Sequence, residues 1–396
     1  MSDVNSDPVV IVGMARTPMG AMQGALSALS APQLGSAAIR AALADAGVAG
    51  SDVDEVLMGC VLPAGVGQAP ARQAALGAGI PEGTPTSTVN KVCGSGMKTV
   101  MMARDALLVG DASVVVAGGM ESMSNAPYLL PKARGGMRLG HGKVMDHMFL
   151  DGLENAYDGQ LMGNFAECTA DKYAFTREEQ DSFALESLAR ANAAIEQGAF
   201  EREIAPVTIS SRRGDVEVSV DEGPGSARPD KIPQLKPAFR KDGTVTAANA
   251  SSISDGAAAL VLMRESEAQR RGLKPLAVLR GQTQFAQEPE WFTTAPVGAM
   301  QALLEKTGWS TADVDLFEIN EAFAVVTMSA MKELDLPHDK VNVNGGACAL
   351  GHPLGASGAR IIVTLLGALE KRGLSKGVAS LCIGGGEATA IAIERV

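Results

Sequence analysis

The sequence predicts an α/β protein made of two duplicated halves, and three observations lead to this prediction. Short apolar runs alternate with segments of helical periodicity, a stretch near residue 44 has a counterpart near residue 305, and a region of different composition lies between them. Buried strands that alternate with helices are typical of an α/β fold, and we expect a mainly parallel sheet. With 396 residues, the chain is long enough for two or three structural units.

The first half reads as strands and helices in alternation. Pro8–Gly13 is an apolar run typical of a buried strand, and Gln33–Gly47 has apolar residues at helical spacing before a glycine suited to a helix C-cap. Val53–Met58 predicts a second strand. Met97–Gly110 predicts a helix, and Ala112–Ala117 predicts the buried strand that follows it.

The second half of the chain repeats this pattern. The segment Ala44–Gly59 (ADAGVAGSDVDEVLMG) aligns with Glu305–Asn320 (EKTGWSTADVDLFEIN). Further on, Ser95 opens a helix that leads to VVVAGG, and Ser357 opens a helix that leads to LCIGGG. Several matched positions share one register, which favours a duplicated unit over the alternative, a chance similarity of two α/β units. The matched pairs are Gly47/Gly308, Asp52/Asp313, Val53/Val314 and Asp54/Asp315.

The region between the halves has a different character, and we interpret it as an insertion that carries ligand contacts. Its first part is rich in Gly, Met, Pro and charge, without a clean period. Thr176–Gly198 predicts a helix opened by a T-x-x-E capping box, and Asp215–Pro237 is rich in turn residues. The expected units are a first half over 1–123 and 251–275, an inserted loop domain over 124–250, and a second half over 276–396.

The composition argues against several classes of protein. The formal net charge of −11 does not suit a general binder of nucleic acids or membrane surfaces. No segment has the roughly 20 mainly apolar residues of a membrane span, and we find no signal-peptide pattern at the N-terminus. Five cysteines in so long a chain form no disulfide framework, and their odd number indicates reduced thiols. We therefore expect a cytoplasmic protein.

Cys93 is the first candidate for chemistry. In Asn90–Lys98 (NKVCGSGMK) this cysteine is followed by Gly-Ser-Gly and then by a predicted helix. The N–H groups and the dipole at a helix N-terminus favour a thiolate, and the glycines let a substrate approach the backbone. We expect Cys93 to have a depressed pKa and to react with iodoacetamide faster than the other four thiols. The alternative is an inert cysteine in a packed turn.

His352 is the second candidate. It lies in the glycine-rich segment Gly345–Gly358 (GGACALGHPLGASG), before a predicted helix, where it can act as the general base for a cysteine. Metal binding is a weaker interpretation, because Cys348 and His352 have no second pair at ligand spacing. A purely structural histidine is the other alternative. No Walker A motif, HExxH or CxxC occurs in the chain.

Two strand ends in the second half add further candidates. Cys382 ends an apolar run before three glycines, and by the repeat it occupies a strand end in the half opposite Cys93. Strand ends and helix starts of two such halves can converge at the crevice between them. Asn320 opens the sequence NEAF, where it can hold a water or donate to an oxyanion while Glu321 orients a neighbour. A core cysteine and an ordinary turn stay open as alternatives. The remaining cysteines read as small apolar fillers: Cys60, Cys168 and Cys348.

Taken together, these motifs resemble the thiolase family. NKVCGSG, NEAF, GGACALGHPLGASG and LCIGGG occur in this order over essentially the whole chain, and their combination is far more specific than any one of them. The resemblance implies a five-layer αβαβα fold of two similar halves, with a loop domain inserted in the first. It also implies that Asn125–Met148 is a tetramerisation loop, so a homotetramer is expected.

The resemblance assigns a role to each catalytic candidate. Cys93 is the nucleophile that takes the acyl group, and His352 activates it. Cys382 is the second acid/base, which removes the α-proton of acetyl-CoA or protonates the leaving enolate. One oxyanion hole comes from His352 and a water held by Asn320. The other comes from the backbone N–H groups of Cys93 and Gly384. A thioester exchange followed by a Claisen step needs these groups.

The resemblance also implies contacts to coenzyme A. AANASSISD (247–255) resembles the family's pantetheine-contacting turn, with Ser251 as the hydrogen-bonding serine and Ala247 beside it. Leu153 and Met162 match positions that contact the pantetheine and acyl part.

Three positions depart from the family's pattern. Leu161 stands where the short-chain biosynthetic members usually have a histidine. Phe292 stands where an acyl-pocket wall residue, often Met, is usual. The adenine-side region is rearranged and offers Arg228 and Lys231 without a clean match, so the phosphate contacts stay open.

The activity implied is that of an acetyl-CoA C-acetyltransferase. The reaction is the reversible thiolytic cleavage of acetoacetyl-CoA, or the condensation of two acetyl-CoA, by a ping-pong route through acyl-Cys93. Coenzyme A thioesters are substrates here, and neither a cofactor nor a metal is expected. The main alternative is a broader 3-ketoacyl-CoA thiolase of fatty-acid or aromatic degradation. We also weighed a decarboxylating ketoacyl synthase, which Cys382 and the single candidate His352 speak against, and a coenzyme A-binding scaffold with an inactive site.

Overall fold

A mixed β-sheet forms the frame of the protein. The computed structural model describes residues 6–212 and 214–396. Within these residues ten strands join in one sheet, and their bounds are β1 (Val9–Arg16), β2 (Gly20–Ala21), β3 (Glu55–Gly59), β4 (Thr86–Val89), β5 (Val114–Ser122), β10 (Ser254–Arg264), β11 (Ala277–Ala286), β12 (Leu316–Ile319), β13 (Lys376–Ile383) and β14 (Glu387–Arg395). The order is β12-β13-β14-β11-β1-β10-β5-β3-β4, with β2 paired to β10.

The expectation of a mainly parallel sheet is wrong. Only the pairs β3–β4, β3–β5 and β12–β13 run parallel among the described strands. The pairs β1–β10, β10–β5, β11–β14 and β13–β14 are antiparallel. Strand–helix alternation holds in the first part of each half only. A tight glycine turn then joins β13 to β14 as a hairpin, and β10 returns antiparallel after the long insertion.

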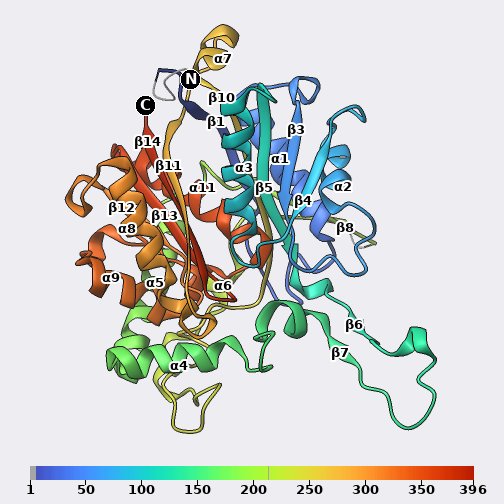
Figure 1. Cartoon of the computed structure of the whole chain (residues 1–396), viewed down its shortest axis with the longest axis vertical. Helices are drawn as coiled ribbons and strands as arrows, with labels where there is room; N and C mark the ends of the chain where they lie inside the picture. The colour runs from blue at the N-terminus through green and yellow to red at the C-terminus, as the bar shows by residue number, and fades with distance from the viewer. Residues whose placement is uncertain (1–5, 213) are drawn as a thin grey trace.

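Helices lie on the outer side of each half of the sheet, and two more helices lie between the halves. This gives the five-layer αβαβα arrangement (Figure 1). The outer helices on the first half are α1 (Ala31–Ala46) and α2 (Pro70–Gly77), and those on the second half are α8 (Ala295–Thr307) and α9 (Ala324–Leu334). Between the two halves of the sheet lie α3 (Ser95–Val109) and α11 (Leu354–Arg372). One apolar core surrounds this central pair, and each outer layer has its own core.

The duplication is visible in matched hydrogen bonds. The Oδ2 of Asp54 accepts the backbone N–H groups that start β5, at 2.8 and 2.9 Å. The Oδ2 of Asp315 accepts the equivalent pair at the start of β13, at 3.0 and 2.8 Å. Upstream, Gly47 and Gly308 end α1 and α8 in the left-handed region, at φ 65° and 69°. The sequence repeat therefore corresponds to a structural repeat.

Glycines let the two central helices approach each other closely. A Cβ on Gly96 would lie 2.8 Å from the backbone N of Ala359, and one on Gly358 would overlap the backbone of Met97. Such distances leave no room for a side chain, so the two helices cross backbone against backbone. The residues just before each helix, Cys93 and His352, are brought to the same end of the central layer by this crossing.

The insertion lies between β5 and β10 and contains two longer helices, α4 (Met162–Tyr173) and α5 (Arg177–Glu196). The capping box that the sequence predicts at Thr176 is present, because its hydroxyl accepts the N–H of Glu179 at 3.1 Å. The short strands β6 (Tyr128–Leu129) and β7 (Met145–Asp146) support an arm that extends away from the body of the molecule (Figure 1). Apart from short 3-10 and π-helical segments, the remaining elements are the hairpin β8 (Val207–Ser211) and β9 (Gly214–Val218), α6 (Glu222–Ser226), α7 (Glu265–Arg271) and α10 (Ala347–Leu350).

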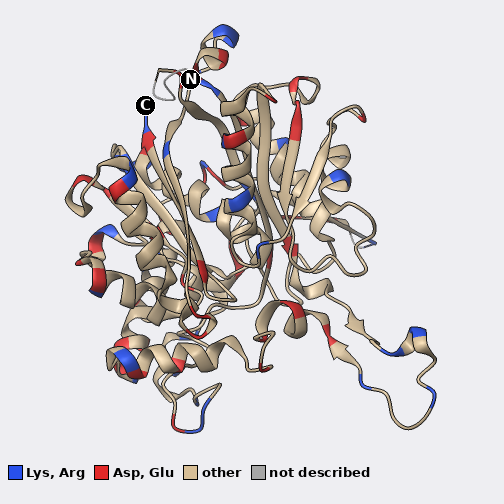
Figure 2. Ribbon diagram, viewed as in Figure 1, with Lys and Arg blue, Asp and Glu red and all other residues tan. Residues whose placement is uncertain are grey.

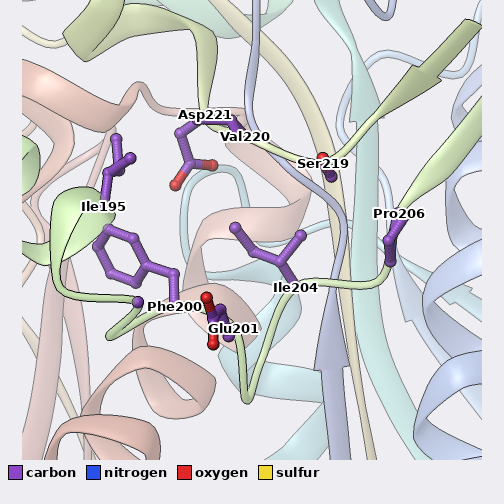
Figure 3. Close-up of a pocket in the computed structure, with 9 residues that line it drawn as sticks. Ile195, Phe200, Glu201, Ile204, Pro206, Ser219, Val220 and Asp221 are labelled. Atoms are coloured by element: carbon purple, nitrogen blue, oxygen red, sulfur yellow. The ribbon is translucent and has the colours of Figure 1, made fainter.

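A buried ionic cluster anchors the insertion to the first half. The guanidinium group of Arg16, at the end of β1, is fully buried and donates to Glu203 at 2.5 Å and to both oxygens of Asp221 at 2.7 and 2.9 Å. The ring of Phe200 lies 4.9 Å from the same cation. Asp221 and Phe200 also line a small cavity between the end of α5 and β9 (Figure 3).

None of the helices in the described part of the chain is both long enough and apolar enough to cross a membrane. In the view of Figure 2, acidic and basic residues are scattered along the ribbon, and the tip of the β6–β7 arm carries basic residues. These residues are Lys132, Arg134, Arg138 and Lys143.

Candidate active site

One apolar cavity of about 420 Å³ gathers most of the residues that the sequence singles out. It opens at the N-terminal ends of the central helices and is covered by the insertion. Its lining includes eight of the predicted site residues: Cys93, Leu153, Met162, Ala247, Ser251, Phe292, His352 and Gly384. Segments from both halves and from the insertion therefore meet at one place.

Cys93 lies in the turn before α3, and its side chain is almost fully buried. Val92 before it adopts φ 46°, which turns the chain sharply into the helix. The sulfur accepts the backbone N–H of Gly384, and this hydrogen bond lowers the pKa of the thiol. Burial has the larger effect, and the negative charge of Glu121 adds to it, so the pKa of Cys93 is raised to about 11.

The predicted depressed pKa of Cys93 is therefore wrong for this structure. The sequence places the thiol at a helix start, which favours the thiolate, but it does not show that the surrounding residues exclude water. Because removal of water disfavours the charged form, the thiol of Cys93 is protonated at neutral pH and needs a base to become a nucleophile.

His352 supplies a neutral imidazole at the same cavity. Its Nδ1 lies 2.5 Å from the Oγ of Ser357, which also donates to the carbonyl oxygen of Pro353 at 2.9 Å. Since that hydroxyl has one hydrogen, the network assigns the ring hydrogen to Nδ1 and leaves the lone pair on Nε2. Nε2 is buried and has no hydrogen-bond partner among the described residues. A free acceptor in this position is what a general base needs.

Two effects keep the imidazole neutral. Burial is the larger, and the positive charge of Arg360 adds to it, so the pKa of His352 falls to about 3. The protonated thiol of Cys93 and the unprotonated imidazole of His352 therefore face one cavity in the forms required for proton transfer from sulfur to nitrogen.

Cys382 lies behind the cavity wall. It is on β13, fully buried, and packed in an apolar cluster with Phe292 and Phe323. Burial raises the pKa of its thiol well above the ordinary value, and the charge of Cys93 raises it further. Gly384, two residues after Cys382, reaches the cavity surface itself.

Asn320 lies beside His352, but it is not among the residues that line the cavity. Its Nδ2 is 3.4 Å from the Nδ1 of His352, and its Oδ1 accepts from Arg360 at 3.3 Å. Arg360 also donates to Glu318 at 3.0 Å, and both of these ionic side chains are buried. Burial raises the pKa of Glu318 to about 8, while the arginine beside it acts in the opposite direction.

One end of the cavity is aromatic. Phe292 and Phe239 both line the cavity, and each contacts Phe323 edge-on, with ring centroids 6.4 and 6.0 Å apart. Leu161, the residue before α4, also lines the cavity and presents an apolar side chain there. Arg228 is exposed and is not among the lining residues. Its role at the phosphates stays a prediction.

Glu121 is a buried carboxylate that the sequence does not reveal. It lies on β5 and accepts three backbone N–H groups, from Val61 at 2.9 Å, Leu62 at 3.1 Å and Gly355 at 2.8 Å. Gly355 belongs to the first turn of α11, next to His352. Burial raises the pKa of Glu121 to about 7, and the backbone donors oppose this effect. The carboxylate thus links the first half to the loop that carries the imidazole.

Sequence reasoning also missed Ser357 and Arg360 as parts of the site. Ser357 is visible in the repeat only as the counterpart of Ser95, not as the partner of an imidazole. Arg360 has a sequence signal, because it is a lone cation in the long apolar stretch of α11. A charge in such a stretch indicates a buried partner, and Glu318 in the strand LFEI is the matching anion.

Among the described residues no group of three or more His, Cys, Asp or Glu could hold a metal ion. The small cavity in Figure 3 contains no cysteine or histidine, and its aspartate, Asp221, is engaged by Arg16.

The chain is similar to known proteins over most of its length. The family model described as "Thiolase, N-terminal domain" matches residues 9–266, and the one described as "Thiolase, C-terminal domain" matches residues 273–395. Acetyl-CoA acetyltransferase 2 of Arabidopsis thaliana is 53% identical over 394 residues, which cover 99% of this chain and 98% of the relative. The acetyl-CoA acetyltransferase of Chromobacterium violaceum is 50% identical, over 98% of this chain and 99% of the relative.

Solved structures are also similar. The crystal structure of the Bacillus anthracis acetyl-CoA acetyltransferase has a TM-score of 0.96 and 44% identity, over 98% of this chain and 99% of that chain. A thiolase from Ascaris suum in complex with coenzyme A has a TM-score of 0.93 and 44% identity, over 98% of this chain and 100% of that chain.

Proposed function

The chain belongs to the thiolase family, and from this premise we propose that it is an acetyl-CoA C-acetyltransferase that cleaves acetoacetyl-CoA with coenzyme A, or condenses two acetyl-CoA, through an acetyl group on Cys93. The single observation that carries the proposal is the shared cavity, which a protonated thiol and a neutral imidazole both face. Acyl transfer to sulfur needs this pair.

In the first half of the cleavage reaction, the proton of the Cys93 thiol moves to Nε2 of His352. The sulfur then attacks the 3-keto carbon of acetoacetyl-CoA, and the bond between C2 and C3 breaks. The acetyl group stays on sulfur, and the departing enolate of acetyl-CoA takes a proton from Cys382. The N–H groups of Cys93 and Gly384 stabilise the negative oxygen on one side.

In the second half, the thiol of coenzyme A attacks the acetyl group on Cys93. Its proton returns through the same acid/base groups, and acetyl-CoA leaves with the thiol of Cys93 restored. After it has accepted a proton, Nε2 of His352 is itself a hydrogen-bond donor. It then stabilises a negatively charged oxygen of the substrate together with a water held by Asn320. This sequence uses cysteine and histidine for every proton transfer, so we propose that no cofactor is required.

The test is thiolysis of acetoacetyl-CoA by the purified wild-type protein and by Cys93→Ala and Cys382→Ser. We expect each substitution to lower kcat by several orders of magnitude. Undiminished turnover in either variant contradicts the role of that residue. A panel of longer 3-ketoacyl-CoA substrates separates the two activities: a sharp optimum at acetoacetyl-CoA supports the acetyltransferase, and a plateau toward longer chains supports the broader thiolase.

We further propose that the protein is cytoplasmic, forms a homotetramer through the β6–β7 arm, and acts in fatty-acid metabolism. The apolar side chains exposed on the arm support its role in assembly, because surfaces of this kind usually become buried between subunits. They are Tyr128, Leu130, Leu139 and Val144. Sedimentation of the wild-type protein beside a Leu139→Asp, Val144→Asp variant tests this, and an unchanged mass contradicts it.

A further inference from the structure

Arg360 is a buried cation beside the acid/base groups of the proposed reaction. It lies on α11 and is completely inaccessible to solvent. Its Nη1 donates to Glu318 at 3.0 Å, and its Nη2 donates to the Oδ1 of Asn320 at 3.3 Å. Taking such a cation out of water is unfavourable, so its presence next to His352 calls for a functional reason.

The guanidinium group decides which way the amide of Asn320 points. A guanidinium has only donors, so it can pair with the oxygen of the amide and not with its NH2 group. The NH2 group therefore faces the other way, with Nδ2 3.4 Å from the Nδ1 of His352. If Arg360 did not hold the oxygen, the amide could turn over and offer Oδ1 to the Nδ1–H of the imidazole.

The turned amide would be harmful to a general base. The Nδ1–H already donates to the Oγ of Ser357, and a second oxygen beside Nδ1 would compete for that hydrogen and loosen the contact that orients the ring. The fixed charge of Arg360 has a separate effect on the imidazole, because after burial it is the second cause of the low pKa of His352. The other titratable groups around this pair are Glu318, Glu321, Cys93 and, on β5, Glu121.

We propose that Arg360 is a positioning residue for the reaction: it holds the amide of Asn320 with its NH2 group toward His352 and keeps a positive charge beside the imidazole. The inference rests on the proposed function, in which His352 is the base and Asn320 holds a water. Glu318 serves as the counterion that makes a buried arginine tolerable at this place.

The experiment compares three forms of the full-length protein in thiolysis of acetoacetyl-CoA. Arg360→Lys keeps the charge but loses the planar fork that reaches Glu318 and Asn320 at once. Arg360→Met with Glu318→Leu removes both charges, and such replacement of a buried pair by apolar residues usually preserves folding. Arg16→Lys is the matched control, because Arg16 is equally buried and paired with carboxylates, but its partners are Glu203 and Asp221 and not Asn320.

We expect Arg360→Lys to lower kcat by about tenfold or more at nearly unchanged KM, since the residue acts on the catalytic groups and not on coenzyme A. In the double variant the acid limb of kcat/KM moves up toward about pH 6.5, the ordinary pKa of histidine. In Arg360→Lys the acid limb of the pH profile of kcat/KM stays closer to that of the wild-type protein, because a positive charge remains beside His352. Arg16→Lys lowers thermal stability without moving either quantity.

Two results would overturn the proposal. One is a wild-type kcat and a wild-type pH profile in both Arg360 variants. The other is an equal loss of kcat in Arg16→Lys, which would mean that any buried arginine has this effect. If Arg360→Lys does not fold, the pH profile of the double variant decides. A wild-type protein without thiolysis activity contradicts the proposed function itself, so the two failures are distinguishable.

Discussion

The Nδ1 of His352 lies 2.5 Å from the Oγ of Ser357, and this contact decides which nitrogen of the imidazole faces the substrate cavity. Ser357 lies near the start of α11, and its hydroxyl donates its one hydrogen to the carbonyl oxygen of Pro353, just before this helix. The imidazole is therefore left with its lone pair on Nε2. A helix of the second half thus prepares a base for a nucleophile of the first half.

Replacement of Ser357 by Ala should lower kcat for thiolysis by about tenfold, because one hydrogen bond that orients the base is lost. Steady-state kinetics at saturating substrate measure the effect. Ser329→Ala is a matched control, since Ser329 is also buried and donates to a carbonyl oxygen of its own helix, at 3.0 Å from Val326. Equal activity of Ser357→Ala and the wild-type protein would refute the orienting role.

The rate at which iodoacetamide alkylates Cys93 should keep rising as the pH is raised from about 7 to about 9. Burial raises the pKa of this thiol, so the reactive thiolate is still increasing over that range. Peptide mapping after brief exposure at each pH gives the rate, with Cys168, which is less buried, as an internal reference. His352→Asn should slow the reaction at neutral pH, since the base is then missing. A rate that is already constant below pH 7 would show a depressed pKa and contradict this expectation.

Glu121→Gln should change how stability depends on pH. The pKa of Glu121 is raised from 4.5 to about 7 in the folded protein, so between these values the folded state keeps a proton that the unfolded state loses. Rising pH therefore favours unfolding, and the free energy of unfolding of the wild-type protein relative to the variant should fall by up to about 1.4 kcal/mol per pH unit.

Urea denaturation of the wild-type and Glu121→Gln proteins between pH 4.5 and 7 measures this difference. The hydrogen bond that the variant loses to a backbone N–H adds a constant and does not change the slope. Glu186→Gln serves as the control, because that side chain is exposed on α5. Parallel pH curves for the wild-type protein and Glu121→Gln would contradict the raised pKa.

Phe292→Ala should shift the preference toward longer 3-ketoacyl chains. Phe292 is buried in the cavity wall and packs edge-on against Phe323, so its removal extends the space available to the acyl group. The ratio of kcat/KM for a six-carbon substrate to that for acetoacetyl-CoA should rise about tenfold, as expected for one or two additional buried methylene groups. Phe183→Ala, a buried aromatic away from the cavity, should leave the ratio unchanged.

Much of the fold could be predicted from the sequence, because its elements depend on local patterns. The helix that ends at Gly47 and the capping box at Thr176 both depend on residues close to one another in the chain. The direction of the strands could not be predicted in this way. It depends on a hairpin at the end of the chain and on where a long insertion returns, and neither leaves a local pattern.

The candidate site shows the same division. Motifs indicated the cavity residues Cys93, His352 and Gly384, because glycine-rich turns before helices and after strands have recognisable sequences. The electrostatics of the site could not be predicted from them. The pKa values of Cys93 and His352 depend on burial and on Glu121 and Arg360, which come from other elements of the fold.

The mass of the protein after brief exposure to acetyl-CoA alone and acid quenching tests most sharply whether Cys93 is the nucleophile. We expect the addition of one acetyl group, located on the Cys93 peptide, absent from Cys93→Ala, and removed when free coenzyme A is added. Turnover without any acetylated cysteine, or an acetyl group on Cys382 in place of Cys93, would rule out Cys93 as the nucleophile.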